Sequence, residues 1–177
     1  MIRLAAVFML LLLASCQSVQ PYDENSRFYQ VPAGSRLTLN KQVTIAPNLA
    51  RTYFQYGKQI SKKQIEKYQP HCYLLLSTLS ENEQLVQPDT FTIHKVERDF
   101  IVSADQQRYA GASMNMFDTS LVEYVNIYQL SSATQPNVLS LNCLQWSDSS
   151  DRLYLTVGEV RQALGGYFSL QLAGINN

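Results

Sequence analysis

The side chains that could carry out chemistry in this chain are few: two histidines, three cysteines and some closely spaced carboxylates. Neither His71 nor His94 has a second histidine or a carboxylate at the spacing of a metal site. Glu81 and Glu83 are two residues apart and would share a strand face, but acid–base catalysis also needs a cleft and a raised pKa. The motifs of serine hydrolases, nucleotide-binding loops and zinc proteases do not occur. The sequence therefore predicts no metal site, no cofactor and no enzymatic activity.

The first cysteine, Cys16, follows an apolar run of residues 4–13. This run has the length of the apolar core of a secretory signal peptide and is shorter than the roughly 20 residues of a membrane-spanning helix. Its end, LASC, resembles a bacterial lipobox, in which the signal peptide is cleaved before the cysteine and the cysteine receives the lipid. We therefore expect a lipoprotein signal peptide at 1–15 and lipidation of Cys16. The alternative is an ordinary signal peptide or an uncleaved anchor.

The residues after the cysteine indicate where the chain would be held. Lipoproteins with Asp directly after the lipidated cysteine tend to remain at the inner membrane, whereas this chain has Gln17. We therefore expect a lipid-anchored protein of the outer membrane, facing the periplasm or the cell surface. The lipidated cysteine and a polar, flexible tether would occupy 16–34. Residues 35–177 would form a single β-rich domain, a normal size for one hydrophobic core.

Cys72 and Cys143 are the thiols that remain once Cys16 is assigned to the lipid. A domain outside the inner membrane folds in an oxidising compartment, where such a pair commonly forms a disulfide. Each cysteine lies in a strand-like run, HCYLLLSTL and NVLSLNCLQW, so a bridge between neighbouring strands is geometrically reasonable. The alternative is a nucleophilic cysteine assisted by a histidine, but no flanking pattern of a thiol enzyme supports it.

Alternation of apolar and polar side chains predicts strands through most of the domain. Residues 36–45 alternate as a half-buried strand does, and 52–59 continue the pattern until Gly57 marks a hairpin turn. Cys72–Leu79 is apolar on both faces, which is typical of a central strand covered on both sides. Further strands are predicted at 90–96, 99–103, 121–130, 138–145 and 167–172.

A short helix is predicted near the C-terminus. Thr156 and Glu159 form a capping box, apolar residues at helical spacing follow, and Gly165 supplies a C-terminal stop. About eight strands joined by short connections, with this one helix, indicate a mainly β fold. We expect an antiparallel sandwich or a partly open barrel with the helix packed on one face or end.

Charge is unevenly distributed along the chain. The whole sequence is neutral, and loss of the signal peptide removes Arg3 to leave a net charge near −1, which gives no general attraction to nucleic acid. The segment 41–67 nevertheless has one acidic residue, Glu66, and six basic ones: Lys41, Arg51, Lys58, Lys62, Lys63 and Lys67. We expect Lys58, Lys62 and Lys63 to be exposed after a hairpin, away from the helix, and to attract an acidic partner. The alternative is an ordinary solvated loop.

Eleven tyrosines are unusual for a chain of this length. Tyrosine rings pack at the edges of cores and also anchor binding surfaces, and packing is the default expectation. If a partner uses such an anchor, the candidates are Tyr124, Asn126 and Tyr128, which share one face of the predicted strand VEYVNIYQL. That face mixes aromatic and amide groups, as recognition surfaces often do.

Several segments in combination resemble a family of small, uncharacterised proteobacterial outer-membrane lipoproteins with a Pro-His-Cys…Cys pattern. They are RTYFQYGKQI, KYQPHCYLLL, PDTFTIHKV, LSLNCLQW and TVGEVRQALGGYFSL, which span most of residues 35–172. The resemblance implies lipidation at Cys16 and a disulfide between Cys72 and Cys143, and it implies no activity. The lysine-rich residues 58–67 depart from the family pattern, so no role of that segment is carried over.

Two kinds of function remain open. The first is a non-enzymatic envelope lipoprotein, an accessory or binding module held in the membrane through its N-terminal lipid and contacting another envelope protein. The second is a periplasmic lysozyme inhibitor-like β-barrel module. The segment RYAGASMNM at 108–116 is similar to the Tyr- and Gly-containing loop that those inhibitors insert into a glycosidase cleft.

Overall fold

A computed structural model gives the structure of the protein and describes residues 23–102, 121–148 and 154–174. The elements within these residues are β1 (Arg36–Leu39), β2 (Val43–Ile45), β3 (Arg51–Gln55), β4 (Lys58–Ile60), η1 (Lys62–Gln64), β5 (His71–Leu76), β6 (Gln84–Val86), β7 (Asp89–Val102), β8 (Leu121–Ser131), β9 (Val138–Asp148), α3 (Val157–Leu164), η2 (Gly165–Tyr167) and β10 (Phe168–Gln171).

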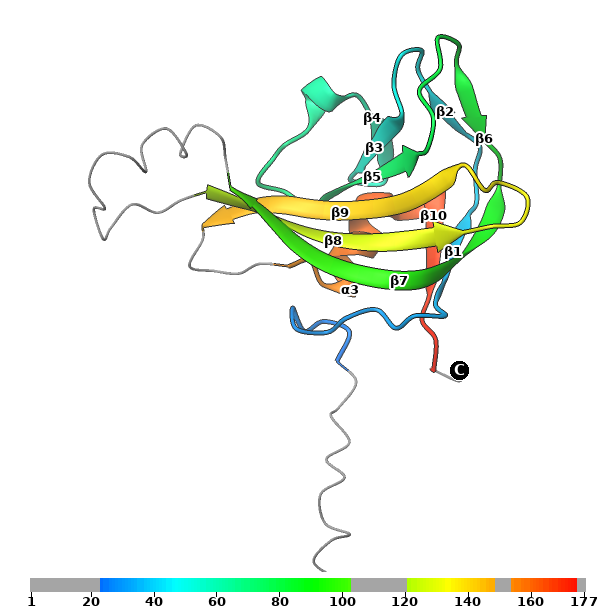
Figure 1. Ribbon diagram of the computed structural model, residues 1–177. Coiled ribbons are helices and arrows are strands. Elements are labelled where there is room, and N and C mark those ends of the chain that lie inside the picture. The colour runs from blue at the N-terminus through cyan, green and yellow to red at the C-terminus, as the bar shows by residue number, and fades with distance from the viewer. Residues whose placement is uncertain (1–22, 103–120, 149–153, 175–177) are drawn as a thin grey trace, which may run out of the picture.

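Eight of these strands form one antiparallel sheet in the order β10-β1-β7-β8-β9-β5-β3-β4, and β2 pairs with β6 in a separate two-stranded sheet. The large sheet curves as a half-barrel, and Figure 1 shows β7, β8 and β9 passing in front of α3. The predicted mainly β class, with a single short C-terminal helix among the described elements, is confirmed in its partly open barrel form.

The core lies between the inner face of the sheet and α3. Because side chains alternate along a strand, one set from each strand points inward, and the helix packs its apolar side chains against β3, β5 and β10. Phe54 of β3 is fully buried, and its ring lies 5.3 Å from the rings of both Tyr167 and Phe168. The sheet thus wraps around the helix that it covers.

The predicted disulfide is confirmed. Cys72 of β5 and Cys143 of β9 stand directly opposite each other in the strand pairing and are joined by a disulfide. Both side chains are completely buried in the core. The bond therefore joins two central strands from within.

The predicted capping box and C-terminal stop of α3 are also confirmed. The Glu159 amide donates a hydrogen bond of 3.2 Å to the Thr156 hydroxyl, and the Thr156 amide donates one of 2.8 Å to the Glu159 carboxylate. Gly165 ends the helix with a φ of 52°, a backbone region that favours glycine. The predicted turn at Gly57 is present between β3 and β4.

Two strand assignments differ from the prediction, and one strand was not predicted. Residues 36–45 form two strands in different sheets, because the chain turns at Asn40, whose amide donates to the Tyr167 carbonyl. Residues 90–96 and 99–102 belong to one long strand, β7, with a bulge at His94, and residue 103 lies outside the described residues. The short strand β6 was not predicted, since it pairs only with the equally short β2.

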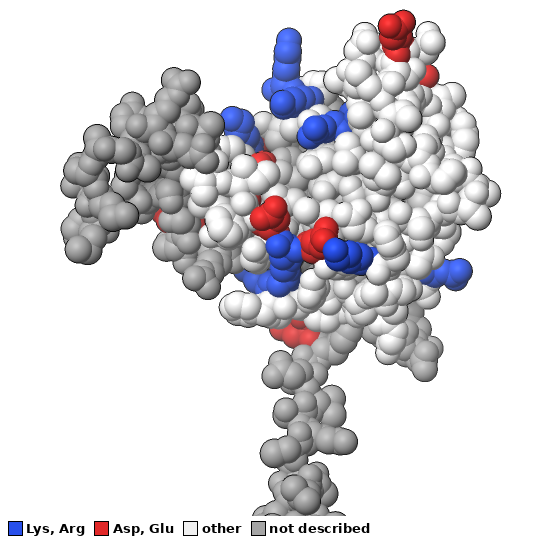
Figure 2. Space-filling view, viewed as in Figure 1, with Lys and Arg blue, Asp and Glu red and all other residues white. Residues whose placement is uncertain are grey.

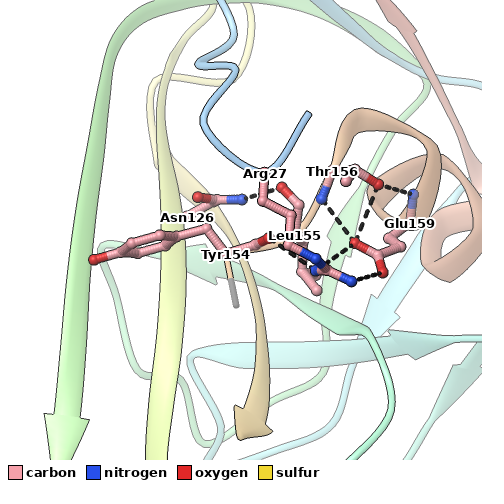
Figure 3. A network of polar contacts seen from close by, with 6 residues as sticks. All are labelled: Arg27, Asn126, Tyr154, Leu155, Thr156 and Glu159. Carbon is pink, nitrogen blue, oxygen red and sulfur yellow. Dashed lines mark hydrogen bonds and ion pairs between the residues drawn. The ribbon is translucent and has the colours of Figure 1, made fainter. Parts of the chain in front are cut away.

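Part of the predicted tether belongs to the folded domain. We call residues 23–31 the N-terminal clasp, because they are fastened to the start of α3. Figure 3 shows the Arg27 guanidinium reaching the Glu159 carboxylate at 2.9 and 3.2 Å, and it also donates to the Tyr154 carbonyl. Val31 is buried in the core cluster. The domain therefore begins before residue 35.

Candidate functional site: a groove on the outer face of the sheet

The outer face of the sheet collects side chains from five neighbouring strands. Successive side chains of a strand alternate between the two faces of the sheet, so every second residue of each strand points away from α3. These residues form an apolar and aromatic floor bordered by charged groups. The residues that line the hollow are Arg51 and Tyr53 of β3, His71 and Tyr73 of β5, Asp99 and Ile101 of β7, Glu123, Val125 and Ile127 of β8, Leu144 and Trp146 of β9, and Lys62, Ile65 and Lys67 from the segment after β4.

One wall of this hollow is the segment 61–69, which is held in place through Gln55. The Gln55 side chain is buried, accepts a hydrogen bond from the Glu66 amide and donates one to the Glu66 carbonyl, both of 3.0 Å. The Trp146 amide donates to the Lys67 carbonyl at 2.9 Å, which ties the segment to β9. This lysine-rich segment is therefore attached to the sheet at several points.

The hollow between this wall and the sheet has a volume of about 380 Å³ and is open to solvent on one side. We call it the outer groove. Figure 2 looks onto this face of the molecule, where several basic side chains lie above its centre and acidic side chains, with further basic ones beside them, lie at and below its centre. Its volume is within the range of clefts that bind small molecules or a few side chains of a partner.

Two cations of the outer groove lie over aromatic rings. The Arg51 guanidinium carbon is 5.0 Å from the centre of the Tyr73 ring, and the Lys67 ammonium is 5.3 Å from that of Trp146. Such contacts stabilise by about 0.5–1 kcal/mol at exposed sites. They hold the cations beside the apolar floor, where Lys67 also interacts electrostatically with Glu123.

Burial shifts the pKa of three titratable side chains of the groove, and one of them is Tyr73, whose pKa it raises above the ordinary value. Burial raises the pKa of Glu123 above its ordinary value, and the Trp146 indole with the two nearby lysines, Lys67 and Lys62, opposes this rise. Burial lowers the pKa of His71, although its Nδ1 donates a hydrogen bond of 2.9 Å to the Gln69 carbonyl. His71 is therefore neutral near pH 7.

The basic residues that the sequence singled out have different positions. Lys62 lines the outer groove, whereas Lys58 of β4 and Lys63 of η1 are exposed and do not line it. The turn that precedes Lys58 lies against the end of α3, through a hydrogen bond from the Gly57 amide to the Ala163 carbonyl. The basic stretch therefore begins next to the helix, and the prediction that it lies away from the helix was wrong for its first residue.

Tyr124, Asn126 and Tyr128 share one face of β8, as predicted from the alternation, but this face points inward and all three side chains are buried. Asn126 donates a hydrogen bond of 2.9 Å to the Leu155 carbonyl and accepts one from Arg98 (Figure 3 shows the former). Burial raises the pKa of Tyr128 well above its ordinary value. These side chains serve packing in this structure, and their burial leaves no surface for a partner.

Several groove residues were not singled out from the sequence. Arg51, Tyr73, Glu123 and Trp146 are far apart in the chain and come together only through strand pairing. A signal for the groove wall was present in Gln55, an amide between aromatic residues in the run TYFQYG. A polar side chain at that position needs a partner when it is buried.

Two further predictions fall outside the described residues: the lipidation site Cys16 and the inhibitor-like segment 108–116. Both remain predictions. Across residues 23–102, 121–148 and 154–174, no three His, Cys, Asp or Glu side chains come together as a metal site would require. Over the same part of the chain, no helix has the length and apolar character needed to cross a membrane.

Comparison with known proteins gives no match that would assign a family or an activity. No family model matches the chain, and neither a curated protein nor a solved structure matches it significantly.

Proposed function

We propose that this protein is a non-enzymatic binding module of the bacterial envelope, anchored by a lipid at Cys16 and using the outer groove to hold a segment of another envelope protein. The observation that carries the proposal is the groove itself: an aromatic and apolar floor lies beside three cations, Arg51, Lys62 and Lys67, which outnumber the two carboxylates of the lining, Asp99 and Glu123. A segment with apolar side chains and a carboxylate would complement both features.

The lipid anchor is supported by the sequence LASC at the end of the apolar run, and Gln17 after it favours the outer membrane. The buried disulfide that joins Cys72 and Cys143 agrees with folding in an oxidising compartment. The paired cysteines also agree with the envelope lipoproteins that the sequence resembles. The same features would suit a protein that faces either the periplasm or the cell surface.

Binding without catalysis is part of the proposal. The residues that line the groove in the described chain include no serine, threonine or cysteine that could act as a nucleophile. Its histidine, His71, is almost completely buried, and its ring is engaged with the backbone at Gln69. These features favour recognition over covalent chemistry.

The binding proposal is tested by photo-crosslinking in intact cells. A photoreactive residue replaces Tyr73 in the groove or, as a control, Leu85 of β6, which is exposed and does not line the groove. We expect a discrete protein adduct from position 73 only. Lys62→Gln with Lys67→Gln should weaken this adduct, whereas Lys58→Gln with Lys63→Gln removes equal charge outside the groove and should leave it largely intact.

Adducts of equal yield from positions 73 and 85 would contradict a groove-specific partner. Equal loss of the adduct in the two lysine double variants would point to general electrostatic attraction.

The anchor is tested separately: Cys16→Ser should abolish membrane attachment, and intact mass spectrometry of the mature protein should show a lipidated start at Cys16. A different mature start, or no lipid mass, would remove the lipoprotein part of the proposal.

A further inference from the structure

The N-terminal clasp presents an aromatic ring to solvent. Phe28 is 90% exposed, the highest value among the large apolar side chains of the described residues. Its backbone is fixed: its amide donates to the Ser26 hydroxyl at 3.2 Å, and its carbonyl accepts from Arg98 of β7 at 3.3 Å. Single exposed apolar side chains are common on protein surfaces, so the position of this ring relative to the proposed anchor decides what it can contact.

Ion pairs hold the rest of the clasp. Arg27 pairs with Glu159 at 2.9 Å, Arg161 of α3 pairs with Glu24 at 2.7 Å, and the Val157 amide donates to the Glu24 carbonyl. The charges of these four side chains are therefore compensated within the domain. Because the backbone is already ordered, placing the ring in another environment costs little further conformational entropy.

The chain between the proposed anchor and the clasp is short. Six residues separate Cys16 from Asp23, so this connection spans at most about 24 Å even when fully extended. The clasp must therefore remain within that distance of the lipid surface. Phe28 is five residues after Asp23, so this exposed ring lies within the part of the domain that is nearest to the anchor in the chain.

We infer that the Phe28 ring inserts into the interfacial region of the bilayer that holds the Cys16 lipid, and that the clasp is the membrane-facing side of the domain. This inference rests on the proposed lipid anchor. Aromatic side chains are favoured at membrane interfaces. Phe100 of β7 is 58% exposed and lies on the same strand face as Arg98, whose guanidinium holds the Phe28 carbonyl. Arg27 and Glu24 are paired with α3, and Asp23 leaves one exposed carboxylate on the clasp, so the contact is made by the apolar ring and needs no anionic lipid.

This orientation has a consequence for the outer groove. In Figure 1 the clasp, coloured blue, lies at the lower edge of the domain. The 3-10 helix η1, which is part of the groove wall and follows β4, lies at the upper edge. With the clasp against the bilayer, the lysine-bearing wall of the groove stands on the far side, where a partner protein reaches it from the aqueous phase.

The test uses the lipidated full-length protein in vesicles of phosphatidylcholine, with or without brominated acyl chains that quench tryptophan. Trp146→Phe removes the single natural tryptophan, and a new one is placed by Phe28→Trp or, as the matched control, by Leu85→Trp. Leu85 is 50% exposed on β6, remote from the clasp in Figure 1. Circular dichroism and flotation with the vesicles verify folding and anchoring of each variant.

We expect tryptophan at position 28 to show blue-shifted emission and at least several-fold stronger quenching by brominated lipid than tryptophan at position 85, with no dependence on salt. Weak quenching at both positions, in protein that floats with the vesicles and carries the lipid mass, would overturn the inference and leave the anchor intact. Equal strong quenching would overturn the orientation. Absence of the lipid mass together with failure to float would overturn the anchor and, with it, this inference.

Discussion

The amide of Gly57 donates a hydrogen bond of 3.0 Å to the carbonyl of Ala163, so the turn between β3 and β4 is joined directly to the last turn of α3. The two backbones are in close contact here: a Cβ built on Gly165 would lie 2.3 Å from the Cα of Gly57. Glycine at both positions allows this approach. The contact connects the helix inside the half-barrel with the hairpin that leads into the groove wall.

Gly165→Ala should destabilise the protein by about 2–4 kcal/mol, since a side chain there would meet the Gly57 backbone and would also occupy an unfavourable positive φ. The free energy of unfolding from urea titration is the measurement. Gly174→Ala is the matched control, because Gly174 has a φ of +81° but nothing within 4 Å of an added Cβ. It should lose only about 1–2 kcal/mol. Equal losses would show that the Gly57 contact adds nothing.

The disulfide makes a second prediction. It closes a loop with a sequence separation of 71 residues, for which the chain-entropy relation gives about 4 kcal/mol of stabilisation. Cys143→Ala should lower the free energy of unfolding by a few kcal/mol. A reductant should destabilise the wild type by a similar amount and leave a variant with both cysteines replaced unchanged. Two titratable thiols in native protein taken from the periplasm would contradict the bond.

Local features of this fold could be predicted from the sequence because their signals are local. The start of α3 is encoded by Thr156 and Glu159, which contact each other within one turn. The strand that carries Cys72 could be predicted from its apolar run, although it is not covered on both sides: Tyr73 and Leu75 on its outer face are only partly buried. These signals need no knowledge of distant parts of the chain.

The outer groove could not be predicted, because its members meet only through the sheet. Arg51 reaches Tyr73 across one strand pair, and Lys67 lies over Trp146 although many residues separate them in the chain. The β8 residues show the same limit. Alternation placed Tyr124 and Tyr128 on one face, but the packing of the clasp and of residues 154–155 against the sheet decides that this face is the inner one.

Gln55 should control the order of the groove wall. Gln55→Leu removes the hydrogen bonds to Glu66, so the segment 61–69 should open more often and trypsin should cleave faster after Lys62, Lys63 and Lys67. The loss of a buried polar contact should also cost about 1–3 kcal/mol of stability. Rates of limited proteolysis, followed by mass spectrometry, measure the opening.

The matched control for this experiment is Gln129→Leu. Gln129 is also on the outward-pointing side of the sheet, but its side chain donates to Glu97 and not to the wall. Cleavage after the three lysines should be unchanged in this variant. If both substitutions accelerated cleavage equally, general destabilisation would explain the result and the anchoring role of Gln55 would be wrong.

Asp89 at the start of β7 should make stability depend on acid. Burial alone would raise its pKa, but side-chain hydrogen bonds from Ser132, Thr134 and Gln135, with the Thr90 amide, lower the pKa from 3.8 to about 2. Because the folded pKa is below the unfolded one, the carboxylate stabilises the fold above about pH 4, and this stabilisation is lost as the pH falls from about 4 to about 2.

Asp89→Asn keeps the shape and removes the charge, so it should reduce stability by about 1 kcal/mol at pH 7. The difference from the wild type should close over that acid range in urea titrations, and Ser132→Ala, which removes one donor, should give a smaller gap that closes in the same range. A gap of constant size from pH 7 to pH 2 would show that the ionised carboxylate is not its source.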